Sequence, residues 1–283
     1  MDKIIEAVLL GAIQGITEFL PISSSAHLKI FAWIFNFNDI PDYFDLALHI
    51  GTILALVIYF IKDWIKLITS GFTMLFNKEK AKEEKEISFY GKLFWTIVLV
   101  TGIAGVLSLV LEKVSEKVIG ENQKLEFSII AVMLIILGIV LYFVDKKCKS
   151  SKSFEELKFK DVMLIGMSQA LAAAFPGTSR SGITLTTSRA LKIDRESSVK
   201  ISFLLAAPIV AGASAYTLLK ELLAGTLNFQ EYGLMLFAGI FTSFAIGMLS
   251  IKLMMNYIKN KDFSIFSIWR IVVGILIFIL LFK

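Results

Sequence analysis

Cysteine is nearly absent from this chain of 283 residues, since Cys148 is the only one. A single cysteine excludes an intramolecular disulfide and any metal centre built from several thiolates. The sequence also lacks Asn-x-Ser/Thr and the motifs Gly-x-x-x-x-Gly-Lys, Gly-x-Ser-x-Gly, His-Glu-x-x-His and Gly-x-Gly-x-x-Gly. It therefore carries no signature of a nucleotide-binding loop, a serine hydrolase, a zinc protease or a dinucleotide-binding fold.

Charge is also scarce: 19% of the residues are charged, whereas 56% are hydrophobic and the mean hydropathy is +0.74. Soluble domains are roughly 45–50% apolar. Runs of about 20 apolar residues can cross the hydrocarbon core of a bilayer. Six such runs are found near residues 44–61, 93–111, 127–144, 201–219, 232–251 and 264–282. The sequence predicts an all-α polytopic membrane protein with both termini on the same side.

The net charge of +5 indicates membrane topology rather than nucleic-acid binding, because the basic residues are spread over loops without an aromatic-interleaved patch. Of the 29 Lys and Arg residues, nineteen fall in loops on one side of the six spans and seven on the other. The positive-inside rule places the larger set in the cytoplasm and both termini outside. Arg180, Lys200 and Arg270 remain at membrane depth.

Two internal matches indicate that the chain repeats one unit. At an offset of 155 residues "LGAIQGITEFLPISSS" lies over "IGMSQALAAAFPGTSR", and at an offset of 136 residues 127–139 lie over 263–275. The matches predict two units, residues 1–150 and 151–283, each a re-entrant helix-turn-helix followed by three spans. Because three crossings are an odd number, the second unit is expected to be inverted, as in many transporters.

Each predicted unit begins with an apolar segment that a proline breaks, at about 4–40 and 161–190. Pro21 is followed by three serines, and Pro176 by Gly-Thr-Ser-Arg-Ser-Gly. A helix is expected to stop before each proline, and the following serines can cap a second short helix. Irregular backbone at this depth is tolerated only where it is buried or lines a wet cavity.

The two short helices would bring their N-termini together near the middle of the bilayer. Their free N–H groups and the positive ends of their dipoles favour an anion, most naturally a phosphate. Arg180 fits this interpretation, because a guanidinium at that depth costs at least ~2.5–3.5 kcal/mol and should face a cavity and a counter-charge. Arginine also binds phosphate oxygens in a bidentate manner.

Gln14 and Glu18 lie four residues apart and share one helical face. Glu18 would repel a diphosphate, and a hard divalent cation, Mg²⁺ or Ca²⁺, resolves the conflict by bridging carboxylate and phosphate oxygens. The sequence therefore predicts a metal site at Glu18 and Gln14. His27 is a candidate acid, base or nucleophile, and Ser24 is the other candidate nucleophile.

Three further features receive structural interpretations. His49, inside an apolar span, is a candidate neighbour of the site but more simply a structural residue. Arg270 is interpreted as a structural or headgroup contact. Gly239, Ser243 and Gly247 have four-residue spacing, which predicts a close-packing helix face.

The motifs "QGITEFLPISSSAH" and "PGTSRSG" resemble those of the undecaprenyl-diphosphate phosphatase family, the bacitracin-resistance proteins. The resemblance implies an enzyme of the cell membrane that hydrolyses a polyprenyl diphosphate to the monophosphate. This reaction recycles the lipid carrier of cell-envelope and peptidoglycan synthesis. The resemblance further implies a divalent metal and an active site open to the outer face, with membrane lipids as partners and no nucleic acid; a homodimer is left open.

By this resemblance Glu18 is the metal-linked acid, His27 and Ser24 form the catalytic pair, and Arg180 clamps the diphosphate. The residues implied to bind substrate are Ser23, Ser25, Gly177, Thr178, Ser179 and Ser181. The family often has a second Glu where this chain has Gln14, which keeps a carbonyl ligand but loses a charge. Ala26 stands where the family frequently has Gly.

The alternative function is transport. An inverted repeat with opposed broken helices also suits a carrier or flippase for a phosphorylated lipid or another anion. Glu18 with His27 favours hydrolysis, because binding of a phosphate anion does not require them in that geometry. A carrier could use both residues for proton coupling, so the sequence leaves the two functions open.

Overall fold

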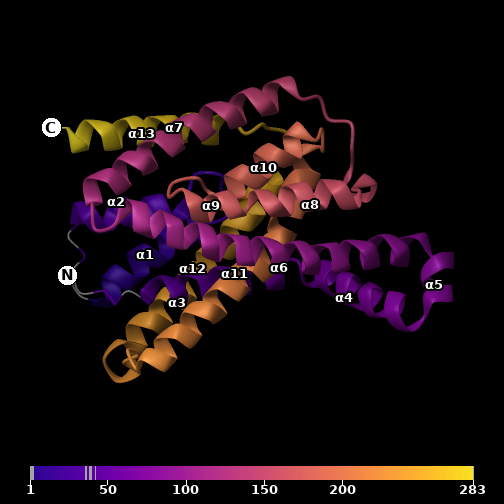
Figure 1. Ribbon diagram of the computed structural model, residues 1–283, viewed down its shortest axis with the longest axis horizontal. Helices are drawn as coiled ribbons and strands as arrows, with labels where there is room; N and C mark the ends of the chain where they lie inside the picture. The colour runs from indigo at the N-terminus through magenta and orange to yellow at the C-terminus, as the bar shows by residue number, and fades with distance from the viewer. Residues whose placement is uncertain (1–2, 36, 38–39, 42, 283) are drawn as a thin grey trace.

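Helices make up the fold of this computed structural model, which describes residues 3–35, 37, 40–41 and 43–282 (Figure 1). Within these residues the only β-type pairing is an isolated bridge between Lys152 and Ile193. The elements are α1 (Lys3–Thr17), α2 (Ser24–Phe35), α3 (Phe44–Tyr59), α4 (Ile61–Phe76), α5 (Lys78–Glu83), α6 (Lys85–Ile119), α7 (Gln123–Lys147), η1 (Phe154–Glu156), α8 (Phe159–Ser168), α9 (Ala170–Ala174), α10 (Arg180–Ala190), α11 (Arg195–Ala224), α12 (Phe229–Ile258) and α13 (Ser264–Leu281).

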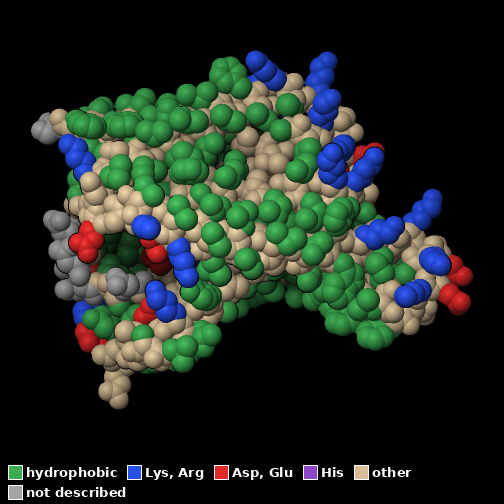
Figure 2. All heavy atoms as spheres, viewed as in Figure 1, with side chains coloured by type: hydrophobic (Ala, Val, Ile, Leu, Met, Phe, Trp, Pro, Cys, Tyr) green, Lys and Arg blue, Asp and Glu red, His purple; other side chains and the backbone are tan. Residues whose placement is uncertain are grey.

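Five helices, α6, α7, α11, α12 and α13, are long and apolar enough to cross a membrane. The pair α3 and α4 supplies a sixth candidate, although the two helices are bent by 77°. Large apolar side chains cover the outer faces of the bundle, while Lys and Arg gather toward its two ends (Figure 2). The prediction of an all-helical polytopic membrane protein is confirmed.

The charged segment after α4 is helical. α5 and the first turns of α6 join α4 into a helical hairpin that projects at the right of Figure 1. α4 packs closely on α6, because Gly71 leaves room for the Phe94 ring and its carbonyl accepts the Trp95 indole N–H at 3.1 Å. Lys66 and Glu86 pair across the hairpin at 2.8 Å. The charged segment therefore belongs to two paired helices, and the exposed ion pair contributes little to their stability.

Small residues allow α1 and α3 to pack against α12. A Cβ at Gly11 would lie 3.0 Å from the Gly239 carbonyl oxygen, and one at Gly15 would lie 2.9 Å from the Ser243 carbonyl oxygen. A Cβ at Gly51 of α3 would lie 2.4 Å from the Ile240 carbonyl oxygen. In a membrane such packing stands in for the hydrophobic effect. The predicted close-packing face of α12 is thus confirmed, and it holds α1 in place.

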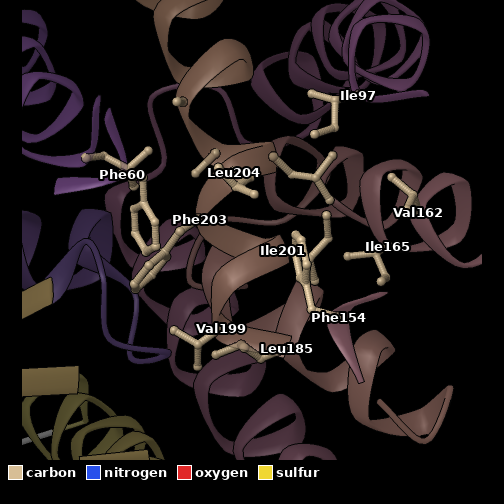
Figure 3. Close-up of a cluster of buried hydrophobic side chains, with 14 of the residues drawn as sticks. Phe60, Ile97, Phe154, Val162, Ile165, Leu185, Val199, Ile201, Phe203 and Leu204 are labelled. Atoms are coloured by element: carbon tan, nitrogen blue, oxygen red, sulfur yellow. The ribbon is translucent and has the colours of Figure 1, made fainter. Parts of the chain in front are cut away.

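The largest hydrophobic core lies around α11, where side chains of α6, α8 and α10 converge (Figure 3). Phe203 of α11 contacts the ring of Phe19 edge-on, with centroids 5.5 Å apart. Phe60, at the bend between α3 and α4, also packs on Phe203, with ring centroids 6.0 Å apart. Both contacts are near the favoured edge-to-face geometry. The turn after α1 is thereby anchored to α11.

Both predicted helix breaks are present. α1 stops four residues before Pro21, and α9 stops two residues before Pro176. The residue that caps each following helix has a left-handed backbone, with φ of 74° at Ser23 and 66° at Ser179. Ser179 Oγ accepts the Gly182 N–H at 3.1 Å, and Ser23 Oγ accepts the Ala26 N–H at 3.4 Å. α2 and α10 thus begin at comparable caps.

Ion pairs mark the two ends of the bundle. Lys3 pairs with Glu231 at one end, where Lys124 lies over the Phe282 ring. The beginning of α1 and the end of α13 therefore lie at the same end, on the left of Figure 1. The other end, called here the lysine-rich end, carries α5 and the loops that follow α7 and α12. There Asp145 binds both Arg189 and Arg195.

Candidate active site

Glu18 is the centre of a polar cluster formed by three helices. Its Oε2 accepts hydrogen bonds from Ser24 Oγ at 2.6 Å and from Gln14 Nε2 at 3.2 Å, and Arg180 Nη2 binds Oε1 at 3.2 Å. Gln14 lies on α1, whereas Ser24 and Arg180 are the first residues of α2 and α10. The two broken segments therefore meet at one buried carboxylate.

Arg180 keeps donors free for a ligand. Its Nε and Nη1 are buried and have no hydrogen-bond partner among the described residues. Buried donors are normally satisfied, and an unpaired one costs about 1–3 kcal/mol. The ion pair with Glu18 uses only one nitrogen of a fork that binds two oxygens of one phosphate. The arrangement is that of an anion site.

A cavity of about 170 Å³ lies over this cluster. It is lined from the first break by Glu18, Ser23, Ser24 and Ser25, and from the second by Gly177, Thr178, Ser179, Arg180 and Ser181. Gly177 has a φ of 86°, and a Cβ there would lie 2.8 Å from the backbone of Ile130. All residues predicted to bind substrate therefore line one small polar cavity.

A larger groove of about 690 Å³ shares His49, Ala172, Arg180 and Val210 with this cavity. It lies between α3, α6, α9 and α11 and is mostly apolar. At Gly102, Gly105 and Gly212 a Cβ would meet nothing within 4 Å, so these glycines widen it. Its outer part carries Asp45, Glu112 and Tyr216. Figure 2 shows a hollow at the left-hand end, framed by acidic and basic side chains.

His27 lies outside the lining of both cavities. Its Nδ1 is 2.7 Å from the Ser23 carbonyl oxygen, and its Nε2 accepts the Trp269 indole N–H at 2.9 Å. With Nε2 accepting, Nδ1 carries the proton and donates to Ser23. Both ring nitrogens are thus occupied by protein groups. His27 therefore links the turn at Ser23 to Trp269 of α13.

His49 is the histidine that lines both cavities. It is half-buried on α3, and its Nδ1 is 2.8 Å from the Asp45 carbonyl oxygen. If Nδ1 donates to that carbonyl, Nε2 offers a lone pair. Sequence reasoning ranked His49 below His27. The available signal was an ionisable side chain inside an apolar span, which marks a functional residue by default.

Arg270 binds backbone carbonyls of both broken segments and does not line the small cavity. Its side chain is fully buried, and Nη1 donates to the Pro21 carbonyl at 3.3 Å. Nη2 donates to the carbonyls of Thr178 at 2.9 Å and Gly177 at 3.4 Å. Further bonds reach the α7 carbonyls of Met133 and Leu134. A single guanidinium thus satisfies backbone groups that both breaks leave unpaired.

The oxygen atoms of Glu18 and Gln14 fit a divalent cation whose other ligands are phosphate oxygens and water. Gln14 is fully buried, and its Oε1 has no partner in the described part of the chain. Glu18 adds a carboxylate beside it. No group of three or more His, Cys, Asp or Glu gathers among the described residues. This set suits Mg²⁺ or Ca²⁺ carried by a diphosphate better than a closed, all-protein site.

Comparisons with known proteins show the family to which this chain belongs. A protein-family model described as "Bacitracin resistance protein BacA" matches residues 7–276. A Caldicellulosiruptor bescii protein named undecaprenyl-diphosphatase is 39% identical over 265 residues, which cover 94% of this chain and 92% of that protein. Proteins of the same name from Elusimicrobium minutum and Pelotomaculum thermopropionicum are 38% and 36% identical, with at least 96% of each chain covered. This chain is therefore a member of the BacA family of bacitracin resistance proteins.

Proposed function

We propose that this protein is an integral-membrane phosphatase that hydrolyses a polyprenyl diphosphate, with undecaprenyl diphosphate as its substrate, to the monophosphate. The observation that carries the proposal is the pairing of Glu18 and Ser24 with an arginine whose remaining donors are free. Ser24 and Arg180 are the first residues of α2 and α10, and Glu18 follows the end of α1. Arg180, whose Nε and Nη1 have no partner among the described residues, also lines the apolar groove. The relatives named undecaprenyl-diphosphatase support the substrate.

The terminal phosphate would occupy the small cavity, where Arg180 Nε and Nη1 and the first N–H groups of α2 and α10 can bind its oxygens. The isoprenoid chain would follow the apolar groove toward the membrane. Preorganised donors of this kind stabilise the charge that develops on phosphoryl oxygens. A divalent cation held by Glu18 and Gln14 would supply further charge neutralisation when bound.

Ser24 is the candidate nucleophile, because its hydroxyl donates to Glu18 at 2.6 Å and the carboxylate can take its proton. In-line attack by Ser24 Oγ on the terminal phosphorus would break the bond to the bridging oxygen, leaving the lipid monophosphate and a phosphoserine. Water would then hydrolyse the phosphoserine. Alternatively Ser24 and Glu18 position a water for direct attack. The geometry favours His49 over His27 as the base that activates this water.

Phosphate release by the detergent-purified protein from a polyprenyl diphosphate, measured with Mg²⁺, Ca²⁺ or EDTA, tests the proposal. We expect release that requires a metal, and a loss of at least about 100-fold in Glu18→Gln, because general-base catalysis contributes 10²–10⁴-fold. The exposed Glu231, which pairs with Lys3, provides the matched control Glu231→Gln. If the wild type binds the lipid but releases no phosphate with any metal, hydrolysis is wrong and transport should be tested.

The same assay separates the two histidines. His49→Gln is expected to lower kcat by about 100-fold with little change in thermal stability, as for the loss of a general base. His27→Gln is expected to lower the melting temperature, because the Ser23 turn loses its tie to Trp269. The reverse pattern would return His27 to the catalytic pair.

The proposal includes two inverted units, residues 1–150 and 151–283. Supporting it, Gly138 of α7 faces Ser267 and Ile271 of α13, and Gly274 of α13 faces Ala131 and Ile135 of α7. The offset of 136 residues relates Gly138 to Gly274, Ala131 to Ser267 and Ile135 to Ile271. The two glycines therefore make equivalent contacts, each with the opposite helix. A second pair of contacts corresponds in the same way. In one, α1 packs along α12; in the other, α8 and α9, the counterparts of α1, pack along α6, the counterpart of α12. Such reciprocal packing is what a two-fold relation between the units produces.

We infer the orientation in the cell membrane from the charge distribution: the lysine-rich end faces the cytoplasm, and both termini and the apolar groove face outward. A reporter that fluoresces only in the cytoplasm, fused within residues 145–160, is expected to be active. The same reporter fused after α13 is expected to be dark. The opposite pattern would show that the orientation is reversed and that the apolar groove opens to the cytoplasmic face.

A further inference from the structure

A second large cavity lies at the lysine-rich end and shares no lining residue with the phosphate site. It has a volume of about 790 Å³ and lies between the end of α4, the first turns of α6 and the start of α8. Lys85, Lys92 and Lys158 line it, and its described lining contains no Asp or Glu. We call this cavity the lysine groove. All of its charged lining side chains are therefore positive.

Carboxylates close in sequence to these lysines form ion pairs with other lysines: Glu84, next to Lys85, lies 3.9 Å from Lys80. Glu86 pairs with Lys66 at 2.8 Å, and Asp161 pairs with Lys152 at 2.9 Å. No ion pair is found for the three groove lysines among the described residues, and all three are exposed. Three ammonium groups around one groove repel one another unless an anion lies between them. The lysine groove therefore attracts an anion.

The lysine groove also crosses the boundary between headgroups and hydrocarbon. Lys92 immediately precedes the apolar stretch 93–111 of α6, and Leu99 lies about 10 Å further along that helix by its rise per residue. Trp95, a residue type enriched at membrane interfaces, lines the same wall. Phe159 is 61% exposed beside Lys158. One wall is thus charged at headgroup level and apolar below it.

The surface around the groove has the same mixed character. In Figure 2, Lys and Arg side chains gather at the right-hand end, around the projecting hairpin and the elements above it, with hydrophobic surface between them. Exposed Ile61, Ile65, Ile68 and Phe72 form a stripe along α4. An apolar stripe with this spacing lies in lipid rather than in water. The hairpin therefore brings the groove to the membrane surface.

We propose that the lysine groove binds one anionic glycerophospholipid. The headgroup phosphate lies among the three lysines, and an acyl chain runs along Leu93 and Leu99 into the bilayer. Basic pockets at the cytoplasmic side of membrane helices bind anionic headgroups, and each lysine near the surface strengthens the binding. A soluble anion would not explain the apolar wall, and a zwitterionic lipid would leave the three charges uncompensated. This proposal stands independently of the phosphatase activity.

Native mass spectrometry of the purified full-length protein tests the proposal with phosphatidylglycerol and phosphatidylcholine of identical acyl chains. The test variant is Lys85→Gln with Lys92→Gln and Lys158→Gln. The matched control is Lys113→Gln with Lys117→Gln and Lys124→Gln, which removes three lysines at the opposite end. We expect the wild type and the control to retain one phosphatidylglycerol preferentially. The test variant should lose at least about tenfold of that preference, from the contribution of each lysine.

Equal retention of the two lipids by the wild type would overturn the proposal, as would an unchanged preference in the test variant. An equal loss in the control would show that overall charge, not this groove, attracts the lipid. Circular dichroism of both triple variants verifies that they fold. The substitutions lie outside the phosphate site, so phosphate release in phosphatidylcholine vesicles should match the wild type.

Discussion

Arg180→Ala is expected to lower kcat/KM for polyprenyl diphosphate hydrolysis by about 10³-fold or more, as found for arginines that stabilise phosphoryl-transfer charge. The guanidinium is the only cation in the lining of the small cavity in the described chain, and two of its nitrogens are free to bind phosphate. Arg180→Lys keeps the charge but not the planar fork. It should recover part of the binding and little of kcat. Steady-state kinetics of both variants give kcat and KM separately.

Stability and catalysis can be separated at this position. Arg180→Gln alone leaves the buried Glu18 carboxylate without its ion-pair partner, so the melting temperature should fall. Combining Arg180→Gln with Glu18→Gln removes both charges and should restore much of the stability while activity stays absent. If the double variant recovered activity with stability, Arg180 would be a structural partner of Glu18, contrary to the proposed role.

The prolines and serines of the two breaks carry most of the sequence's information about the site. Pro21 and Pro176 end helices by local geometry alone, and the serines after them cap helices in the structure. Glu18, Ser24 and Arg180 then meet because each is an ionisable or polar side chain at membrane depth, where it must find a partner. The composition of the small cavity could therefore be predicted.

The residues behind the cavity were harder to predict, because their partners are distant or have no sequence signature. Trp269 is 242 residues from His27, and no local pattern connects them. Arg270 binds backbone carbonyls, which every residue possesses. The α4 hairpin was missed for another reason: Lys62, Asp63 and Lys66 interrupt its apolar stripe and lower its hydropathy below that of a span.

Arg270→Gln is expected to have the second large effect, on both folding and catalysis. The change leaves carbonyls of Pro21, Gly177 and Thr178 without their donor inside the membrane, at about 1–3 kcal/mol for each unsatisfied group. At roughly 2–4 °C per kcal/mol for a chain of this size, the melting temperature in detergent should fall by about 10 °C. Arg195→Gln, at the lysine-rich end, is the matched control for loss of an arginine.

A purely structural role for Arg270 predicts that activity follows the folded fraction. A positioning role predicts more, because the Pro21 and Thr178 carbonyls belong to the turns that place Ser24 and Arg180. At 10 °C, where the Arg270→Gln variant is mostly folded, kcat should still be at least tenfold below that of the wild type while KM changes little. Arg270→Lys, with three donors on one nitrogen, should recover more stability than kcat. Full kcat in the folded Arg270→Gln variant would mean that the two turns hold the phosphate site without this arginine.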